Sequence, residues 1–394
     1  MTRIADLVDV PTARLRDSGP LRSPMADGFS VRPWSAFEMA ALDPAWRDLG
    51  LCAETPNPFY EYWFLAPSLQ QFDPDGRVYL ATHIVDGRLV GLMPLFHDRS
   101  YYGRPLPHLA GWLHPNSFCG EPLVAPGFAE LFWQSLLDWC DSNRRFSCFL
   151  HLCNLPVEGA SFRALQDLCG REGRSLAAVK HVRRAALRHG LSPDRHLAEA
   201  MDKKRRKELD RKRRRLLESG NLVFSRHTDS EGIDRWIDDF LNLESAGWKG
   251  TQCSALSSSP RTESFFREAL SGAAHDGRLE RIAFHLEGRA IAMLCTFLAP
   301  PMAFSFKTAF AEDLSKLSPG MLLQVENLRM LERDDIAMVD SCALPGHPMI
   351  EQIWPDRREL AMVNIAIGGR LRRKVGAILS SIEMRREAHR HDRT

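Results

Sequence analysis

The chain has 394 residues, of which 44% are hydrophobic and 26% charged, and its formal net charge is +2. Such a composition is typical of a globular protein with two or three domains, each able to bury a core. The sequence has no apolar run of about 18 residues, which excludes a membrane-spanning helix. Segment 1–28 carries charges and no apolar core, so we expect a loosely ordered lead-in rather than a secretory signal.

The nine cysteines are scattered along the chain without a CxxC pair. An odd number without framework spacing indicates reduced thiols, so we expect a cytoplasmic protein. Cys148, His151 and Cys153 are close in sequence, but their segment has the pattern of a buried strand, in which residues five apart point to opposite faces. We therefore expect no metal ion.

The first half begins with a short aromatic helix or turn at Asn57–Leu65, followed by a hairpin at Val78–Phe96. The hairpin is indicated by two apolar runs around Asp86-Gly87-Arg88, because an acidic residue and Gly favour a tight turn. We place a first domain at residues 29–190. Its remaining patterns predict helices at Phe128–Cys140 and Gly159–Leu168, and strands at Phe146–Leu152 and Ala177–Leu187.

A basic segment separates the two halves, and we assign residues 191–220 to a linker helix. Ten of the thirteen residues from Lys203 to Arg215 are basic. Such a helix suits transfer RNA, anionic lipid headgroups at a membrane surface, or the phosphates of coenzyme A. It also suits a solvated helix that only joins two domains. Because the net charge is only +2 and no recognition fold accompanies the helix, nucleic acid is the less favoured partner.

The second half repeats the hairpin of the first. Leu279–Phe297 again has two apolar runs around an acidic residue, Gly and Arg. The distance from Val78–Phe96 is too long for a solenoid repeat and fits two copies of one domain. We place the second domain at residues 221–368 and a basic tail at 369–394. The other predicted elements are helices at Glu231–Ser245, from Ser259-Pro260 and at Met321–Glu332, and strands at Met302–Thr308 and Ile336–Cys342.

Several short motifs keep a characteristic order along the chain. They are Asn57-Pro58-Phe59, Lys203–Arg215, Glu244 with Gly247-Trp248-Lys249-Gly250, Ala283–Phe297, Lys307 with Glu312, Ser318-Pro319-Gly320 with Leu322 and Leu323, and Asp340. Together they resemble the GNAT acyltransferase superfamily, and in particular the acetyltransferase domain of the CelD/BcsL group, a relative of the FemABX transferases. The resemblance implies an α/β (α+β) fold of two tandem GNAT-like domains, each a mixed, mostly antiparallel twisted sheet flanked by helices.

The resemblance also implies acyl-CoA or acetyl-CoA as the donor. In the family the pantetheine arm lies along a splayed fourth strand, which we place at Ile291–Phe297. The backbone of Met293, Leu294 and Cys295 would then hold the arm. In the first copy Pro94 stands where Cys295 stands in the second, and Pro lacks a donor N–H. We therefore expect the second domain to be active and the first to be structural or substrate-shaping.

The pyrophosphate loop of simple GNAT enzymes is absent from both halves. The expected substitute is the helix start at Ser318-Pro319-Gly320, continued by Met321. Free backbone N–H groups and the positive end of the helix dipole attract an anion there. Gly320 would allow a phosphate to approach the backbone closely.

Amide formation from a thioester requires a base for the amine proton and a group that polarises the carbonyl. Glu244 is the leading candidate base, because it lies on the apolar face of its predicted helix. His347 is the alternative base. Lys307 stands in an otherwise apolar strand, where it either pairs with Asp340 or Glu244 or meets a phosphate or carbonyl.

We expect an acyl-CoA-dependent N-acyltransferase with its acceptor amine in a pocket walled by Trp248 and Lys249. The resemblance implies that the product is an envelope polysaccharide precursor or an N-acylated sphingoid base, as made by bacterial ceramide synthases. We expect the protein to act in the cytoplasm, at the inner face of the membrane. The alternatives are a FemABX-like transferase that uses aminoacyl-tRNA, and a non-catalytic scaffold in exopolysaccharide biosynthesis. The transferase hypothesis requires an open crevice between diverging strands in the second half.

Overall fold

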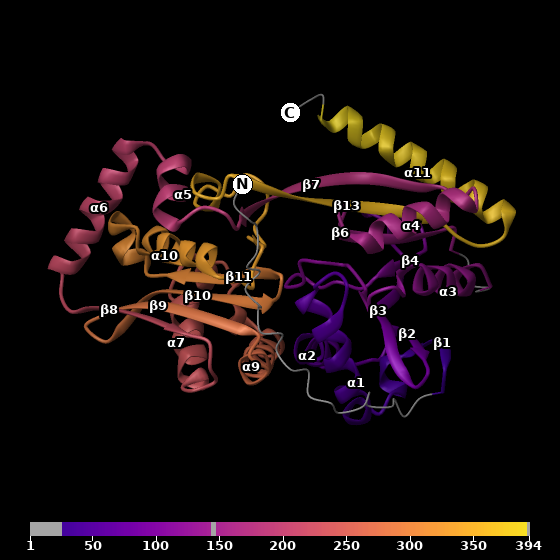
Figure 1. Ribbon diagram of the computed structural model, residues 1–394, viewed down its shortest axis with the longest axis horizontal. Coiled ribbons are helices and arrows are strands. Elements are labelled where there is room, and N and C mark those ends of the chain that lie inside the picture. Colours follow the sequence, from indigo (N-terminus) through magenta and orange to yellow (C-terminus); the bar gives the residue numbers. More distant parts are fainter. Residues whose placement is uncertain (1–25, 143–146, 392–394) are drawn as a thin grey trace, which may run out of the picture.

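The computed structural model of the protein describes residues 26–142 and 147–391 (Figure 1). Most of the predicted lead-in 1–28 lies outside these residues. No helix in the described part of the chain combines the length and hydropathy needed to cross a bilayer.

The predicted hairpin of the first half is present as β2 and β3. Asp86 and Gly87 have φ values of 51° and 72°, the left-handed values that a two-residue hairpin turn requires. The elements of this half are, in order, β1 (Gly28–Pro33), α1 (Met39–Cys52), η2 (Pro58–Tyr60), α2 (Tyr62–Phe72), β2 (Tyr79–Val85), β3 (Arg88–Asp98), β4 (His108–Gly111), β5 (Leu123–Val124), α3 (Ala129–Ser142), β6 (Phe149–Pro156), α4 (Ala160–Arg171) and β7 (Leu176–Arg188).

The second half repeats the opening order of the first, a strand, then helices, then three antiparallel strands. Its hairpin turn has the same geometry, with φ values of 51° at Glu287 and 77° at Gly288. The elements are α5 (Pro193–Ala200), α6 (Lys203–Glu218), β8 (Leu222–His227), α7 (Ile233–Ser245), α8 (Trp248–Thr251), α9 (Pro260–His275), β9 (Leu279–Leu286), β10 (Arg289–Ala299), β11 (Met302–Phe310), η4 (Glu312–Leu317), α10 (Pro319–Asn327), η5 (Leu328–Glu332), β12 (Met338–Asp340), η6 (Ile350–Gln352), β13 (Asp356–Ala366) and α11 (Arg370–His391).

The two halves exchange their last strands within one sheet. The strand order in the described residues is β1-β2-β3-β4-β6-β13-β7-β12-β11-β10-β9-β8, with β5 paired to β3. Strand β13 therefore lies between β6 and β7 of the first half, and β7 in turn pairs with β12 of the second. Figure 1 shows β7 and β13 as long neighbouring strands in the upper part of the molecule, below α11. The domain boundaries stay a prediction, since the two copies share strands.

Apolar and ionic contacts also join the halves. Phe59 and Trp63 of the first half belong to the core of the second, whereas Val363 of β13 completes the core of the first. Arg278, at the start of the second hairpin, donates to both carboxylate oxygens of Glu61 at 3.1 and 3.2 Å. Removing one partner of such a buried pair costs about 3–5 kcal/mol, so the pair holds the two copies in one arrangement.

The predicted linker helix consists of two helices. Helix α6 starts separately from α5 because the Asp202 carboxylate accepts a hydrogen bond from the Arg205 backbone N–H at 2.9 Å, as an N-cap does. Figure 1 shows α6 at one end of the long axis of the molecule, where most of its basic side chains are exposed.

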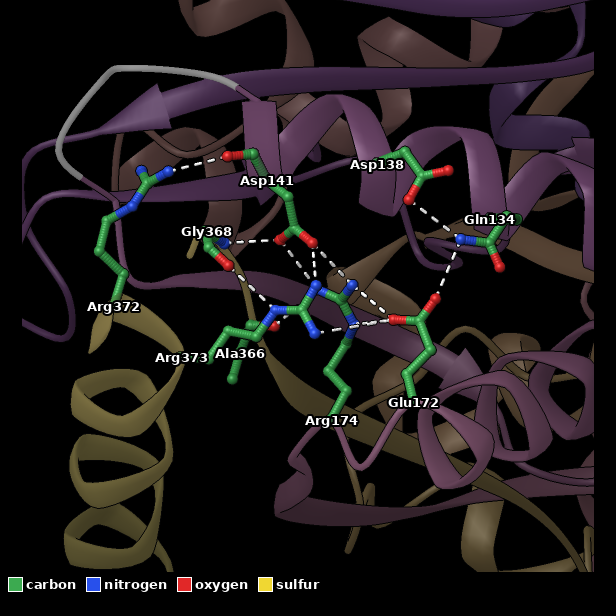
Figure 2. Close-up of polar contacts among 9 residues, drawn as sticks. All are labelled: Gln134, Asp138, Asp141, Glu172, Arg174, Ala366, Gly368, Arg372 and Arg373. Carbon is green, nitrogen blue, oxygen red and sulfur yellow. Dashed lines mark hydrogen bonds and ion pairs between the residues drawn. The ribbon is translucent and has the colours of Figure 1, made fainter. Parts of the chain in front are cut away.

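The predicted basic tail contains a helix, α11, which packs on β7 and β13. A polar network fixes its first turn (Figure 2): the Asp141 carboxylate accepts hydrogen bonds from the Arg174 and Arg373 guanidiniums and from the Gly368 backbone N–H. Burial alone would raise the pKa of Asp141, but Arg174 and Arg373 hold it below its ordinary value. The network ties α11 to the end of α3.

Candidate active site

The strands of the second half diverge where the sequence predicts a crevice. Strands β11 and β12 pair in parallel at three positions, the last of which joins Phe304 to Asp340. Beyond it β11 continues to Phe310, whereas β12 ends. The register between β10 and β11 shifts, so that Phe306 is an extra residue on β11. Such a bulge bends a strand and redirects its side chains.

The residues predicted to hold the pantetheine arm are not available for it. Met293, Leu294 and Cys295 lie in β10, which pairs with β9 on one edge and with β11 on the other. Their backbone N–H and C=O groups are therefore used within the sheet. Counted from β8, the fourth strand is β11 rather than β10. In the described residues β11 has no strand partner on its β12 side beyond Phe304.

Glu244 is buried at the end of α7, with 5% of its surface exposed, in agreement with its place on the apolar face. Its Oε1 accepts a hydrogen bond from Lys249 Nζ at 2.6 Å, and its Oε2 accepts one from the Leu256 backbone N–H at 2.8 Å. The Lys249 side chain remains partly exposed. The pair therefore connects a buried carboxylate to the solvent through one ammonium group.

A small cavity borders this pair. It has a volume of about 30 Å³, and Glu244, Trp248, Lys249 and Thr308 of β11 contribute to its lining. A cavity of this size holds a water molecule but no acceptor. Trp248 is 52% exposed, and its backbone N–H donates to Glu312 Oε1 at 2.7 Å. The predicted acceptor wall thus lies at the protein surface beside β11.

Lys307 follows the β11 bulge directly and is partly buried. Burial, reinforced by the positive charge of Lys249, lowers the pKa of Lys307 from 10.5 to about 8, while Glu244 acts in the opposite direction. Lys307 therefore lies close enough to both to interact electrostatically. Its Nζ donates a hydrogen bond to Asn116 Oδ1 at 2.8 Å. Among the described residues it forms no ion pair within 4 Å with Glu244 or Asp340, the two partners considered from the sequence.

The opening between β11 and β12 is lined by a loop of the first half, residues 112–122. The Phe118 ring lies 5.5 Å from Lys307 Nζ and 6.1 Å from the Phe306 ring centre, and its carbonyl accepts a hydrogen bond from Arg184 at 2.9 Å. Phe118 is half-buried and Asn116 buried, so the crevice is partly filled rather than fully open. No local sequence pattern indicates this contact, because it joins residues 191 positions apart.

The other two predicted catalytic residues, Asp340 and His347, lie apart from the pair formed by Glu244 and Lys249. Asp340 is fully buried between Arg184 and Arg358, whose guanidiniums lie 3.1 and 2.7 Å from its Oδ2. Burial alone would raise the pKa of Asp340, but these two charges hold it below its ordinary value. We therefore assign Asp340 a structural role at the bottom of the crevice. The His347 Nδ1 accepts a hydrogen bond from the Ile350 backbone N–H at 3.3 Å, at a short helical turn.

The predicted anion site at the start of α10 has one unforeseen neighbour. Lys212 of α6 donates a hydrogen bond from Nζ to Ser318 Oγ at 2.9 Å. This places part of the basic helix against the N-terminus of α10. Gly320 has a different role from the predicted one, because a Cβ there would lie 2.8 Å from the Phe310 ring. Its lack of a side chain serves packing, and Met321 is partly buried against a neighbouring core.

Within the described residues, no group of three or more His, Cys, Asp or Glu side chains is arranged to hold a metal ion. The polar centre of the second half is thus built from a carboxylate, two lysines and backbone groups. Such a set suits proton transfer and the binding of a carbonyl or an anion.

Comparison with known proteins agrees with this architecture. Residues 203–347 match the family model of the acetyltransferase (GNAT) domain. The solved structure of FemX superposes with a TM-score of 0.52 at 9% identity, over 82% of this chain and 96% of FemX. A conserved protein of unknown function from Bacteroides thetaiotaomicron has a TM-score of 0.52 at 11% identity, over 86% of this chain and 99% of that protein. No curated protein sequence matches the chain.

At these identities the likeness to solved structures concerns the fold alone. It confirms the predicted α/β class, with a mixed twisted sheet flanked by helices, although the two related units share one continuous sheet rather than having one each. The matched segment contains α6 through β12 and thus Glu244, Lys249 and Lys307. Residues 203–347 thus match the acetyltransferase (GNAT) domain, and the chain as a whole is similar in fold to FemX.

Proposed function

We propose that this protein is an N-acyltransferase that moves an acyl group from a CoA thioester to the nitrogen of an amine acceptor. The observation that carries the proposal is the position of Glu244, Lys249 and Lys307 beside the unpaired edge of β11. An unpaired strand edge offers N–H and C=O groups to an extended ligand that contains amides, as a pantetheine arm does. The thioester would then lie next to the carboxylate and the two lysines.

In the proposed reaction the amine nitrogen attacks the thioester carbonyl carbon, so that a C–N bond forms and the C–S bond breaks. Glu244 accepts the proton that the amine loses, through the water-sized cavity at its side. Protonated Lys307 donates a proton to the leaving thiolate. Because the pKa of Lys307 is lowered to about 8, this ammonium is a better proton donor near neutral pH than an ordinary lysine. Proton return from Glu244 to Lys307 restores both groups.

The phosphates of the donor are assigned to the start of α10. The Gly320 backbone N–H in the first turn of α10, the helix dipole and the Lys212 ammonium provide positive charge there. Helix α10 follows β11 through the turn η4, so a donor that runs along β11 toward α10 would keep its thioester near Lys307. Phe118 has to move for a bulky donor, because it occupies part of this path.

For the acceptor we propose an amine-bearing envelope polysaccharide precursor or a sphingoid long-chain base, as the resemblance to the CelD/BcsL group and to bacterial ceramide synthases suggests. Trp248 and Lys249 stand at the surface beside the carboxylate, where such an amine would arrive. We place the protein in the cytoplasm, at the inner face of the membrane when its substrate is a lipid.

One observation favours a second candidate, a FemABX-like transferase that takes its acyl group from aminoacyl-tRNA. The exposed basic face of α6 continues from Lys212 at the proposed phosphate site. A polyanion longer than CoA would use this whole face. A non-catalytic scaffold, the third possibility, requires no donor.

A thermal-shift titration separates the three. We expect acetyl-CoA or palmitoyl-CoA to raise the melting temperature in a concentration-dependent manner, because a ligand that binds only the folded state stabilises it. Stabilisation by aminoacyl-tRNA alone would replace the CoA proposal with the second candidate, and no response to any donor would favour the scaffold. Mass spectrometry of N-acylated products in cells with and without the gene then identifies the acceptor.

A further inference from the structure

Helix α11 presents an apolar stripe to the solvent. Leu371, Val375, Ile378 and Ile382 are 78%, 40%, 60% and 41% exposed. Their spacing of four, three and four residues places them in one line along the helix. Contiguous exposed aliphatic surface of this kind marks an interaction site more often than scattered single residues do.

The same helix contacts its own protein with small and polar residues. Gly376 lies so close to the sheet that a Cβ there would be 2.2 Å from the Cys148 carbonyl oxygen. Ser380 and Glu383 are buried, and Glu383 lies 3.5 Å from Arg104. This arrangement is the reverse of an ordinary surface helix, whose apolar face packs on the core.

The outward direction of the stripe is fixed rather than accidental. Arg373 of the first turn binds the Asp141 carboxylate, and Arg372 donates to the Asp141 carbonyl at 3.0 Å (Figure 2). Together with the close contact at Gly376, these bonds prevent the helix from turning its aliphatic side chains inward. The stripe is therefore available to a partner.

Positive charge borders the stripe. Arg370, Lys374, Arg385 and Arg386 are exposed, and of these Arg386 lies 3.7 Å from Glu383. At 100° per residue, Lys374 and Arg385 flank one side of the stripe and Arg386 the other. In a homodimer formed through α11, the basic residues of one copy would face the same basic residues of the other. This repulsion disfavours a homodimer and favours an anionic partner.

A cavity opens next to the stripe and extends its apolar surface. Its volume is about 290 Å³. Aliphatic and aromatic side chains line its interior together with two arginines and the one carboxylate, Glu383, that lies within 4 Å of both. An apolar interior with a net positive rim suits a chain of methylene groups below an anionic headgroup. The lining includes Tyr101, Arg104, Phe149, Leu379, Ile382 and Arg386.

We propose that α11 is an interfacial helix that docks the protein on a bilayer of anionic phospholipid. The stripe enters the boundary between headgroups and acyl chains, and the flanking basic residues bind phosphate. Long basic side chains beside an apolar stripe are suited to this position, because they extend toward the headgroups. The proposal concerns a surface outside the acyltransferase centre and does not depend on the donor that the centre uses.

Flotation of the full chain with phosphatidylcholine vesicles, with and without phosphatidylglycerol, tests the proposal. We expect binding to the anionic vesicles, and a loss of roughly tenfold in the Leu371→Ser/Ile378→Ser variant. The matched control is Leu51→Ser/Leu344→Ser, which removes two other exposed leucines (68% and 83%) and should bind normally. Because all four positions are exposed, circular dichroism and the melting temperature should remain unchanged.

A second pair of variants tests which basic residues bind the anionic lipid. Lys374→Gln/Arg385→Gln should weaken binding to the anionic vesicles and reduce its dependence on salt, whereas Lys203→Gln/Lys207→Gln on α6 should leave binding intact. No binding by the wild type, or a loss confined to the α6 variant, overturns the proposal. A dimer in sedimentation experiments that Leu371→Ser/Ile378→Ser dissociates would also overturn it, in favour of a second copy as the occupant of the stripe.

Discussion

The two related units of the chain differ in how the gap between their diverging strands is filled. In the first copy β4 and β6 pair at only two positions before they separate, and in the second copy β11 and β12 separate after three. There the chain itself closes the gap: the Gly120 backbone N–H donates to the Asn154 carbonyl, and a Cβ at Gly120 would lie 2.2 Å from the Cys153 carbonyl oxygen. In the second copy polar side chains and one ring from the neighbouring copy line the gap.

The chemistry of the two copies differs accordingly. Gly111 of β4 and Ser305 of β11 take equivalent places in the pairing with their hairpins. Because Phe306 is an extra residue on β11, the next equivalent position is Trp112 in the first copy, opposite Pro94, and Lys307 in the second, opposite Cys295. The loop that closes the gap of the first copy also carries Asn116 to Lys307, so a residue of the first copy contacts the polar centre of the second.

The largest effect is expected from Glu244→Gln, which removes the candidate base of the second copy. Loss of a general base lowers kcat by about 10²- to 10⁴-fold. The donor affinity, measured by thermal shift, should remain unchanged. Because Lys249 loses its partner, we also expect a small decrease in the melting temperature, and His347→Gln serves as the control that keeps activity. Full activity of Glu244→Gln together with loss in His347→Gln would transfer the role of base to His347.

Lys307→Met tests the second polar group of the site. We expect it to change both the reaction rate and the pH dependence of the free energy of unfolding. We expect kcat at neutral pH to decrease about 100-fold. The folded-state pKa of Lys307 is lowered from 10.5 to about 8, so between these values the folded protein binds fewer protons than the unfolded chain. The wild-type free energy of unfolding therefore rises with pH across this window, and the variant should lose that rise. Identical pH profiles of wild type and variant would contradict the assignment.

Gly120→Ala tests whether the gap of the first copy is really closed. The added methyl group collides with the Cys153 carbonyl oxygen, and we expect a loss of about 3 kcal/mol in the free energy of unfolding by urea denaturation. Gly170→Ala is the matched control, since a Cβ there meets nothing within 4 Å and lies in helix α4, where Ala stabilises. Equal stability of both variants would mean that the first gap can open, and the contrast between the copies would be lost.

Local signals predicted much of the fold. Both hairpin turns are where an acidic residue and Gly indicated them, because a tight turn depends on the φ values of two residues. Helix α7 and the burial of Glu244 followed from apolar spacing. Strand β8 was missed, and the strand that we expected to be the fourth, β10, is the third of its copy. The argument from Pro94 fails for the same reason, since Pro94 lies on the third strand of its copy.

Long-range pairing could not be predicted from one sequence. Strand β13 lies between β6 and β7, and its residues alone do not indicate partners so far away in the chain. The contact of Asn116 with Lys307 and the position of Lys212 beside Ser318 depend on the same exchange of elements between copies. The sequence therefore predicted the residues that the second copy contributes to the candidate site. It did not predict the residues that the first copy and α6 contribute.

The smallest effect concerns the helix that follows the fourth strand, which differs in charge between the copies. Helix α3 has Glu130 in its first turn, which repels an anion, whereas α10 has no acid there and has Lys212 beside Ser318. We expect Lys212→Gln to raise the KM for the acyl-CoA donor about 5- to 10-fold with kcat unchanged, and the exposed Lys203→Gln to have no effect. An equal increase in both variants would mean that the donor contacts the whole of α6, as a transfer RNA would and a coenzyme A molecule held at one helix end would not.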